Sequence, residues 1–425
     1  MRLRSIQFRN LVIITLLGFL GLVLLCFIGP VFSVQSEQPI AVFEEVWETV
    51  NENFYDPNFN GVDWTAEREK YAPQAAQAKS TEEIAGVINQ MLSELQTSHT
   101  HFYTQAEPAY YQLLGIFAPG SSLEEKLAEF LPEGRIDYTG IGIFTRDIHG
   151  KTFIKGILEG SPAAASDLQV GDQLLSVDGV PYEPIQSFVN KTDQEVTLVV
   201  QRTSAPDSQA AIAVTPQQLD PTKMFLEAQK ASVEVIEREN KKIGYMHIWS
   251  YAGDQYQQLL EEELTFGQLK DADGLVLDLR EGWGGANPGY LNIFTAKGPN
   301  LTFVGRDGDK GTWNYQWRKP VVMLVNEGSR SGKEILAFGF QQYDIGPVVG
   351  SKTAGAVVGG RAFLMQDGSL LYLAVVDALT DGERLEGKGI IPDIVAPFSL
   401  EYAQGADPQK ERAIEVVQEL GRGAT

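Results

Sequence analysis

The chain has 425 residues, and its 34 Lys plus Arg against 56 Asp plus Glu give a formal net charge of −22. Hydrophobic residues make up 43% and charged residues 21%, the composition of a globular rather than a disordered protein. So acidic a surface repels phosphate backbones, which argues against nucleic-acid binding. The single cysteine, Cys26, excludes an internal disulfide. No clustered spacing of His, Asp or Glu indicates a metal site, and we expect no cofactor.

Residues 1–36 have the pattern of an export segment. Three arginines lie within the first nine residues, and residues 11–34 carry no charge. A positive flank before an apolar run is typical of a signal peptide or membrane anchor, with the arginines on the cytoplasmic side. The run is long enough to span a bilayer, whereas Pro30 and Ser33 are compatible with cleavage. We expect the protein in the periplasm or cell envelope, attached to the membrane through this segment if it is uncleaved.

Residues 37–103 are predicted to form an N-terminal helical region. A second helix in this region begins after Ser80, which with Glu83 has the pattern of a capping box, and ends near residues 97–101. The first helix of this region is indicated by apolar residues spaced three and four apart, namely Phe43, Val46, Trp47, Val50 and Phe54.

The prolines and glycines of residues 104–136 predict an irregular insertion or linker.

Residues 137–217 change to short strands separated by turns, with a β-branched strand at 196–201. The succession of residues 140–144, 161–163 and 171–179 resembles a PDZ domain. In that family a backbone loop binds the terminal carboxylate of a peptide, which then adds as a strand to the sheet edge. A small β-domain without a ligand is the alternative. The resemblance assigns the peptide-binding loop to Gly140, Ile141, Gly142 and Ile143.

Residues 230–400 alternate apolar strands with helical segments, and residues 401–425 follow as a C-terminal tail. Such alternation predicts a mostly parallel sheet covered by helices. The fold class is therefore an α/β multidomain protein with an N-terminal helical region, a PDZ β-domain and a core sheet domain. The predicted core strands are residues 242–249, 274–279, 321–325 and 347–350, with a helix at 333–343.

Several blocks in this order resemble the carboxyl-terminal processing, or tail-specific, serine peptidase family, from about residue 40 to 397. They include Asp-Leu-Arg-Glu-Gly-Trp-Gly-Gly at 278–285 and Ser-Arg-Ser-Gly-Lys-Glu-Ile at 329–335. The resemblance implies a core of the tail-specific protease type in which Ser331 is the nucleophile. It also implies oxyanion donors from the backbones of Gly332 and Gly284. A nucleophile at a helix N-terminus is close to backbone N–H groups and to the positive end of the helix dipole.

One position departs from this family. Most members activate the serine with a lysine at the position where this chain has Ala356. A relative, the tricorn core protease, uses a Ser-His pair and a glutamate, which match Ser98, His99 and Glu386. A neutral imidazole can take the serine proton, with an ionisation expected near pH 6–7, while the hydroxyl and the carboxylate orient it.

These residues predict an exported serine endopeptidase that recognises and cleaves protein C-terminal regions by acyl transfer from Ser331, activated by His99. Its partners would be protein or peptide substrates, bound through their C-termini. Two alternatives stay open. Lys352 or Lys388 could replace His99 as the base, or the chain could be a catalytically silent PDZ-containing peptide- or ligand-binding protein on the same scaffold.

We predict that residues from about 37 onward face the extracytoplasmic side, because three arginines precede the uncharged run. Alkaline phosphatase fused after residue 40 should be active, and the same fusion without residues 1–36 should not. A fusion that is active only as a cytoplasmic reporter would contradict the prediction. Sequencing the mature N-terminus would establish whether the leader is cleaved.

Overall fold

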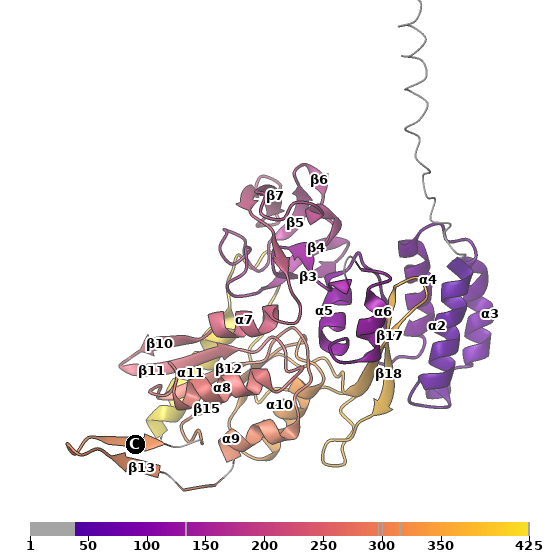
Figure 1. Ribbon diagram of the computed structural model, residues 1–425. Coiled ribbons are helices and arrows are strands. Elements are labelled where there is room, and N and C mark those ends of the chain that lie inside the picture. Colours follow the sequence, from indigo (N-terminus) through magenta and orange to yellow (C-terminus); the bar gives the residue numbers. More distant parts are fainter. Residues whose placement is uncertain (1–38, 132–133, 296, 300, 314–315, 424–425) are drawn as a thin grey trace, which may run out of the picture.

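The computed structural model describes residues 39–131, 134–295, 297–299, 301–313 and 316–423 (Figure 1). The predicted leader, residues 1–36, lies outside them. In the described part of the chain, no helix combines the length and the apolar character needed to cross a membrane.

Three helices form the N-terminal region: α2 (Pro39–Asn53), α3 (Trp64–Ala75) and α4 (Thr81–Ser93). They do not form a core alone. Strands β17 (Val358–Leu364) and β18 (Leu370–Asp377) extend from the core domain and pack against them (Figure 1). The predicted apolar stripe of α2 provides its buried face, since Phe43, Val46 and Val50 are fully buried there. The N-terminal region and the core domain are therefore joined by a shared hydrophobic cluster.

The start of α4 agrees with its sequence pattern more closely than its end. Ser80 Oγ accepts a hydrogen bond from Glu83 N–H at 3.2 Å, but the Glu83 carboxylate accepts from Lys79 N–H rather than from Ser80. The helix ends at Ser93, earlier than predicted. His99 consequently lies in the loop before β1 (His101–Tyr103), with a left-handed φ of +55°.

The prediction of an irregular linker at residues 104–136 is wrong. This segment contains α5 (Pro108–Phe117) and α6 (Ser122–Leu127). Pro108 begins α5 instead of breaking it, because the first helical position requires no N–H donor. Leu113 and Leu114 on α5 are fully buried in the central hydrophobic core.

The PDZ β-domain has a hydrophobic core of its own, with Ile154, Leu198 and Val200 at its centre. Its sheet is antiparallel, and β3 (Ile143–Ile148) is an edge strand. Strand β6 (Val180–Pro181) pairs with β5, and β2 (Tyr138–Gly140) pairs with β9 (Gln217–Leu219). The sheet order is β3 (Ile143–Ile148), β4 (Lys151–Ile157), β5 (Gln173–Val177), β7 (Val196–Gln201) and β8 (Gln209–Val214).

The core domain contains the predicted mostly parallel sheet. All its neighbouring strands pair in parallel except β10 (Glu234–Arg238) with β11 (Lys241–His247). Alternate residues face opposite sides: Leu277 and Met323 contact the cluster that includes α8 (Gln255–Thr265) and α10 (Gly332–Gln342). Val276 and Leu324 contact α11 (Pro408–Gly423) on the other side. The sheet order is β10 (Glu234–Arg238), β11 (Lys241–His247), β12 (Gly274–Asp278), β15 (Val321–Val325), β16 (Val348–Gly350) and β19 (Ile394–Val395).

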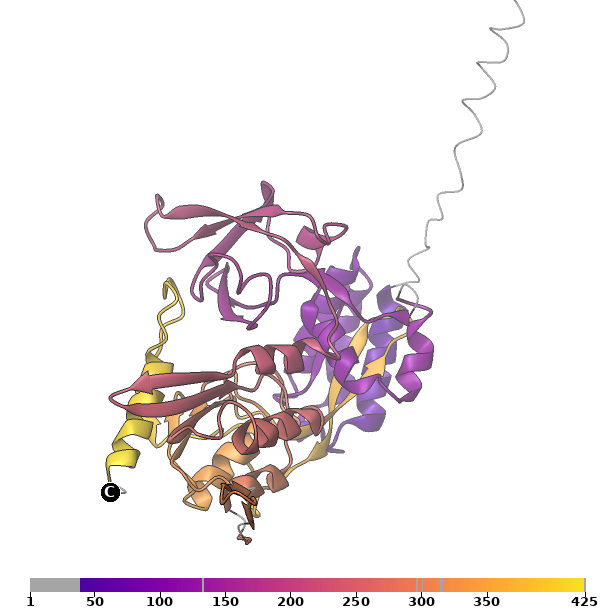
Figure 2. The same cartoon turned by 60° about the vertical axis from the view of Figure 1, so that its left-hand side comes forward.

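The predicted C-terminal tail therefore contributes a helix to the core domain. The segment before α11 also reaches the PDZ domain, which Figure 2 shows above the core sheet. Tyr402 N–H donates to Gly171 O at 3.1 Å, and the Tyr402 ring meets Phe153 edge-on at 5.1 Å. The C-terminal region thus connects the PDZ domain to the core.

Candidate active site

Ser331 lies on a sharp strand-to-helix turn at the carboxyl end of β15, where α10 begins. Its φ of +56° and ψ of −129° are unusual for a residue with a side chain. Such strain is concentrated at functional sites, and nucleophilic serines adopt this kind of turn. Ser331 N–H donates to Ala356 O at 2.8 Å and to Glu334 Oε2 at 3.2 Å, which fixes the turn.

The neighbouring Ser329 has a different environment. It is fully buried, its Oγ donates to Leu279 O at 2.9 Å, and it accepts from Asn326 N–H at 3.1 Å. Ser331 is only half-buried. Of the two serines in the predicted block, Ser331 is the one available to a substrate.

The two predicted oxyanion glycines both lie against Ser331. A Cβ added at Gly284 would come within 2.5 Å of Ser331 Cβ, and one added at Gly332 would overlap the backbone of Ala286. Glycine at both positions is therefore a steric requirement. The Gly284 segment is held by two backbone bonds, from Trp283 N–H to Trp249 O at 2.7 Å and from Tyr251 N–H to Gly284 O at 3.0 Å. We call residues 281–285 the glycine loop.

Lys333 is a component of this site that the sequence analysis missed. Its side chain is fully buried, and Nζ donates to Glu281 O at 2.6 Å and Trp249 O at 3.2 Å. Burial lowers the pKa of Lys333 to about 7, although Asp278 and Glu281 act in the opposite direction. An ordinary lysine in the first turn of a helix gives no sequence signal of this role. Lys333 fixes the glycine loop to the start of α10.

Ser98, His99 and Glu386 form a continuous hydrogen-bonded chain, as their alignment with the tricorn pattern implies. His99 Nδ1 lies 2.8 Å from Ser98 Oγ, and Ser98 Oγ donates to Glu386 Oε2 at 2.9 Å. The Glu386 carboxylate also accepts from Ser98 N–H at 2.8 Å and Val357 N–H at 2.6 Å. His99 and Glu386 are both buried.

The direction of these bonds defines the tautomer of His99. An ionised carboxylate only accepts hydrogen bonds, so the single Ser98 hydroxyl proton is directed to Glu386. The Ser98 oxygen then accepts from His99 Nδ1–H. The other ring nitrogen, Nε2, carries the lone pair that a general base needs.

His99 and Ser331 are connected through the backbone. Ala356 O accepts the Ser331 N–H, and the next residue, Val357, donates to Glu386. Among the described residues, no direct hydrogen bond joins the His99 ring to Ser331 Oγ. Ala356, at the position of the family lysine, is buried beside Ser331 and offers no amine. Lys352 and Lys388 are both exposed.

The pKa of His99 is lower than the sequence predicted. Burial, and to a smaller extent the positive charge of Arg330, lower its pKa to about 3, well below the predicted 6–7. His101 is affected in the same way, to about 4. His99 is therefore neutral around pH 7. When His99 takes up a proton, the resulting imidazolium has to be stabilised by the negative charge of Glu386, which acts through the Ser98 hydroxyl.

The predicted peptide-binding loop of the PDZ domain has backbone groups available. Ile141 O and Gly142 O accept from Ala163 and Leu158, but the N–H groups of Ile141 and Gly142 have no hydrogen-bond partner among the described residues. Gly142 has a φ of +79°, and Ile143 begins the edge strand β3. The geometry is compatible with carboxylate binding.

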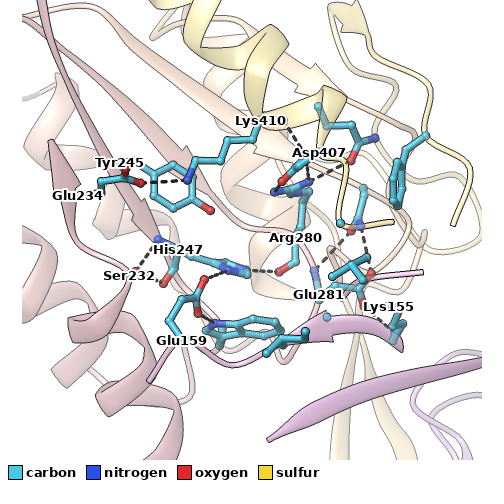
Figure 3. Close-up of a pocket in the computed structure, with 18 of the residues that line it drawn as sticks. Lys155, Glu159, Ser232, Glu234, Tyr245, His247, Arg280, Glu281, Asp407 and Lys410 are labelled. Carbon is cyan, nitrogen blue, oxygen red and sulfur yellow. Dashed lines mark hydrogen bonds and ion pairs between the residues drawn. The ribbon is translucent and has the colours of Figure 1, made fainter. Parts of the chain in front are cut away.

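A cavity of about 430 Å³ separates the PDZ domain, the core sheet and the C-terminal region (Figure 3). From the PDZ side, Glu159 contacts His247 Nδ1 and Trp249 Nε1, and Lys155 Nζ lies 2.6 Å from Glu281 Oε2. Trp249 and Glu281 are the two residues whose carbonyls hold Lys333. The PDZ domain thus directly contacts the residues that position the glycine loop.

Among the described residues, no group of three or more His, Cys, Asp or Glu side chains is arranged to hold a metal ion.

Comparison with known proteins agrees with this architecture. Residues 242–396 match peptidase family S41, residues 38–93 the tricorn protease C1 domain, and residues 153–202 a PDZ domain. Three regions of the chain thus resemble known families: the core domain resembles the S41 peptidases, the N-terminal region the tricorn protease C1 domain, and part of the β-domain a PDZ domain.

Two curated relatives represent the two branches of this resemblance. The carboxyl-terminal-processing protease of a Synechocystis strain is 25% identical over 389 residues, which cover 87% of this chain and 85% of that protein. Tricorn protease homolog 1 of Streptomyces coelicolor is 25% identical over 399 residues, 89% of this chain but 35% of that protein. The chain therefore spans about a third of the tricorn relative. The solved tricorn protease has a similar fold, with a TM-score of 0.53 at 18% identity, covering 90% of this chain and 37% of that one.

We predict that Gly284→Ala will lower the rate at which a fluorophosphonate labels Ser331 by about 100-fold, the typical effect of losing an oxyanion donor. The added methyl would overlap Ser331 Cβ and displace the loop. Gly86→Ala is the matched control, because no atom lies within 4 Å of its added Cβ. Labelling of Gly284→Ala at the wild-type rate would show that the loop does not form the oxyanion site.

Proposed function

We propose that the chain is an exported serine endopeptidase that cleaves polypeptides near their C-termini by acyl transfer from Ser331, with His99 as the general base. The observation that carries this proposal is the Glu386–Ser98–His99 chain, which leaves His99 Nε2 as the proton acceptor. The buried alanine at the family lysine position supports the same assignment.

In the first half of the reaction, Ser331 Oγ attacks the scissile carbonyl while His99 Nε2 takes the hydroxyl proton. The oxyanion that forms is stabilised by the backbone N–H groups of Gly284 and Gly332 and by the N-terminus of α10. When the intermediate collapses, the C–N bond breaks and the leaving amine receives the proton from His99.

The second half repeats these steps with water. His99 Nε2 deprotonates the water that attacks the acyl-enzyme ester, and the proton then returns to Ser331 Oγ as the C–O bond breaks. In both halves the imidazolium forms in a buried site. The Ser98 hydroxyl connects the Glu386 carboxylate to His99 Nδ1–H by hydrogen bonds. The negative charge of Glu386 thereby stabilises the imidazolium, which offsets the hydration that the buried imidazolium lacks.

Two further features belong to the proposal. The PDZ domain would bind the substrate C-terminus through residues 140–143 and deliver the chain to Ser331 from the neighbouring domain. The leader, residues 1–36, would direct the peptidase to the periplasm or cell envelope, where its substrates are proteins of that compartment.

We predict that His99→Ala and Ser331→Ala will each lower kcat by about three decades or more, because the two residues act as a unit. Glu386→Gln and Ser98→Ala should cost less, since they orient the imidazole without accepting the proton. Because the pKa of His99 is lowered to about 3, kcat/KM should not fall through protonation of the base until about pH 4. Hydrolysis of an internally quenched peptide measures these effects.

Lys352→Ala and Lys388→Ala are the controls for this series. Both should stay within about tenfold of wild type, or ~1.4 kcal/mol. Loss of activity in either one, with His99→Ala near wild type, would identify a serine–lysine peptidase. If neither peptide hydrolysis nor fluorophosphonate labelling of Ser331 occurred, the catalytically silent binding protein would be the correct alternative.

We predict that peptides with apolar C-terminal residues and a free carboxylate bind residues 140–143, and that amidation weakens binding by about 10- to 100-fold. The carboxylate would accept charge-assisted bonds from backbone N–H groups, each worth roughly 1.5–3 kcal/mol at most. Fluorescence anisotropy on Ser331→Ala would measure both peptides without turnover. Equal affinities would exclude this binding mode.

A further inference from the structure

Arg330 is the residue immediately before Ser331, and its guanidinium lies over an aromatic ring. The guanidinium carbon lies 5.4 Å from the centroid of the Trp283 ring, and Trp283 belongs to the glycine loop. The ring is itself held, because Trp283 Nε1 donates to the buried Gln112 Oε1 at 2.9 Å. Arg330 as a whole is half-buried, and its guanidinium lies over a ring of the glycine loop.

This cation has no carboxylate partner among the residues that the structure describes, whereas two cations on the PDZ domain do. Lys155 pairs with Glu281 at 2.6 Å, and Arg146 pairs with Glu327 at 2.7 Å. The chain has a net charge of −22, yet among the described residues no carboxylate pairs with this half-buried arginine beside Ser331. A partly desolvated cation gains most from a ligand of opposite charge.

The groups around Arg330 are aromatic or basic. Its charge lowers the pKa of His99 and His101, and it opposes the rise that burial causes in the pKa of Tyr103 and Tyr372. The carboxylates in this region are engaged elsewhere: Glu386 binds Ser98 and Val357, and Glu107 accepts from Thr104 N–H at 3.0 Å.

We infer that Arg330 is a specificity-determining residue that binds a carboxylate of the substrate close to the scissile bond. The carboxylate is either an Asp or Glu side chain or the free C-terminus of a short leaving segment. The planar guanidinium suits bidentate binding of such a group, with its face on Trp283. This inference rests on the proposed function and adds the chemical class of the preferred substrate.

A bound carboxylate would also act on the chemistry. It offsets the Arg330 charge that disfavours protonation of His99, so the imidazole accepts the Ser331 proton more readily. An acidic substrate should therefore raise kcat as well as lower KM. Burial of His99 is the larger cause of its low pKa, so the effect on kcat is partial.

The test uses internally quenched peptides that differ only by Glu or Gln at each position flanking the scissile bond. A second set compares free and amidated C-termini at short distances after that bond. For wild type we expect about tenfold or higher kcat/KM for one carboxylate position over its neutral partner. The first set detects a side-chain carboxylate, and the second detects a terminal one.

Three variants test whether Arg330 causes this preference for a carboxylate. Arg330→Gln should abolish it and raise the apparent pKa of the base, because it removes the charge that disfavours protonation of His99. Arg330→Lys should retain part of it. Arg361→Gln is the matched control, since Arg361 also lies over an aromatic ring, Phe363, at 4.9 Å but is exposed on β17. It should leave the preference unchanged.

Binding of the same peptides to Ser331→Ala provides a readout that is independent of catalysis. The preferred carboxylate peptide should bind about tenfold more tightly than its neutral partner, and Arg330→Gln in this background should remove the difference. Equal kcat/KM and equal affinity within every pair would overturn the inference while leaving the peptidase assignment intact. Absence of Ser331 labelling and of hydrolysis would instead reject the peptidase assignment, with the binding comparison still deciding the role of Arg330.

Discussion

The Glu386 carboxylate joins three segments that are far apart in the sequence. It accepts hydrogen bonds from the backbone and hydroxyl of Ser98, in the N-terminal region, and from Val357, one residue after the alanine that holds Ser331 N–H. A buried carboxylate requires such donors, because each unmet lone pair would cost free energy. Meeting that requirement brings the loop of His99 to the core domain, so one interaction both closes the fold and orients the proposed base.

The opposite side of the site depends on close backbone packing. Gly284 and Gly332 allow the glycine loop to approach the strained turn at Ser331, and Lys333 holds that loop through two carbonyls. The PDZ domain contacts the same elements through Lys155 and Glu159 (Figure 3). Movement of the PDZ domain would therefore change the contacts of the loop that we propose to form the oxyanion site.

Prediction from the sequence succeeded where local chemistry and order along the chain carried the signal. The apolar strands of the parallel sheet, the stripe on α2 and the Ser80 cap follow from spacing and residue type. The segment at 104–136 was misread because Pro108 and the later glycines look like loop residues, although the proline only begins α5. Lys333 was missed for a related reason: whether a helical lysine is buried depends on what packs over the helix, which its neighbours in sequence do not reveal.

The sequence by itself determined which groups are present: a serine before a helix, a Ser-His pair, a glutamate, paired glycines, and no lysine at residue 356. It also determined the class of fold, since alternating strands and helices can bury their apolar faces in few ways. Only the tertiary structure decided the hydrogen bonds that assign the proton to His99 Nδ1 and the low pKa of His99. It also decided that, among the described residues, Arg330 contacts Trp283 but no carboxylate. These properties depend on burial and on charges brought together from distant segments, and neither is a property of local sequence.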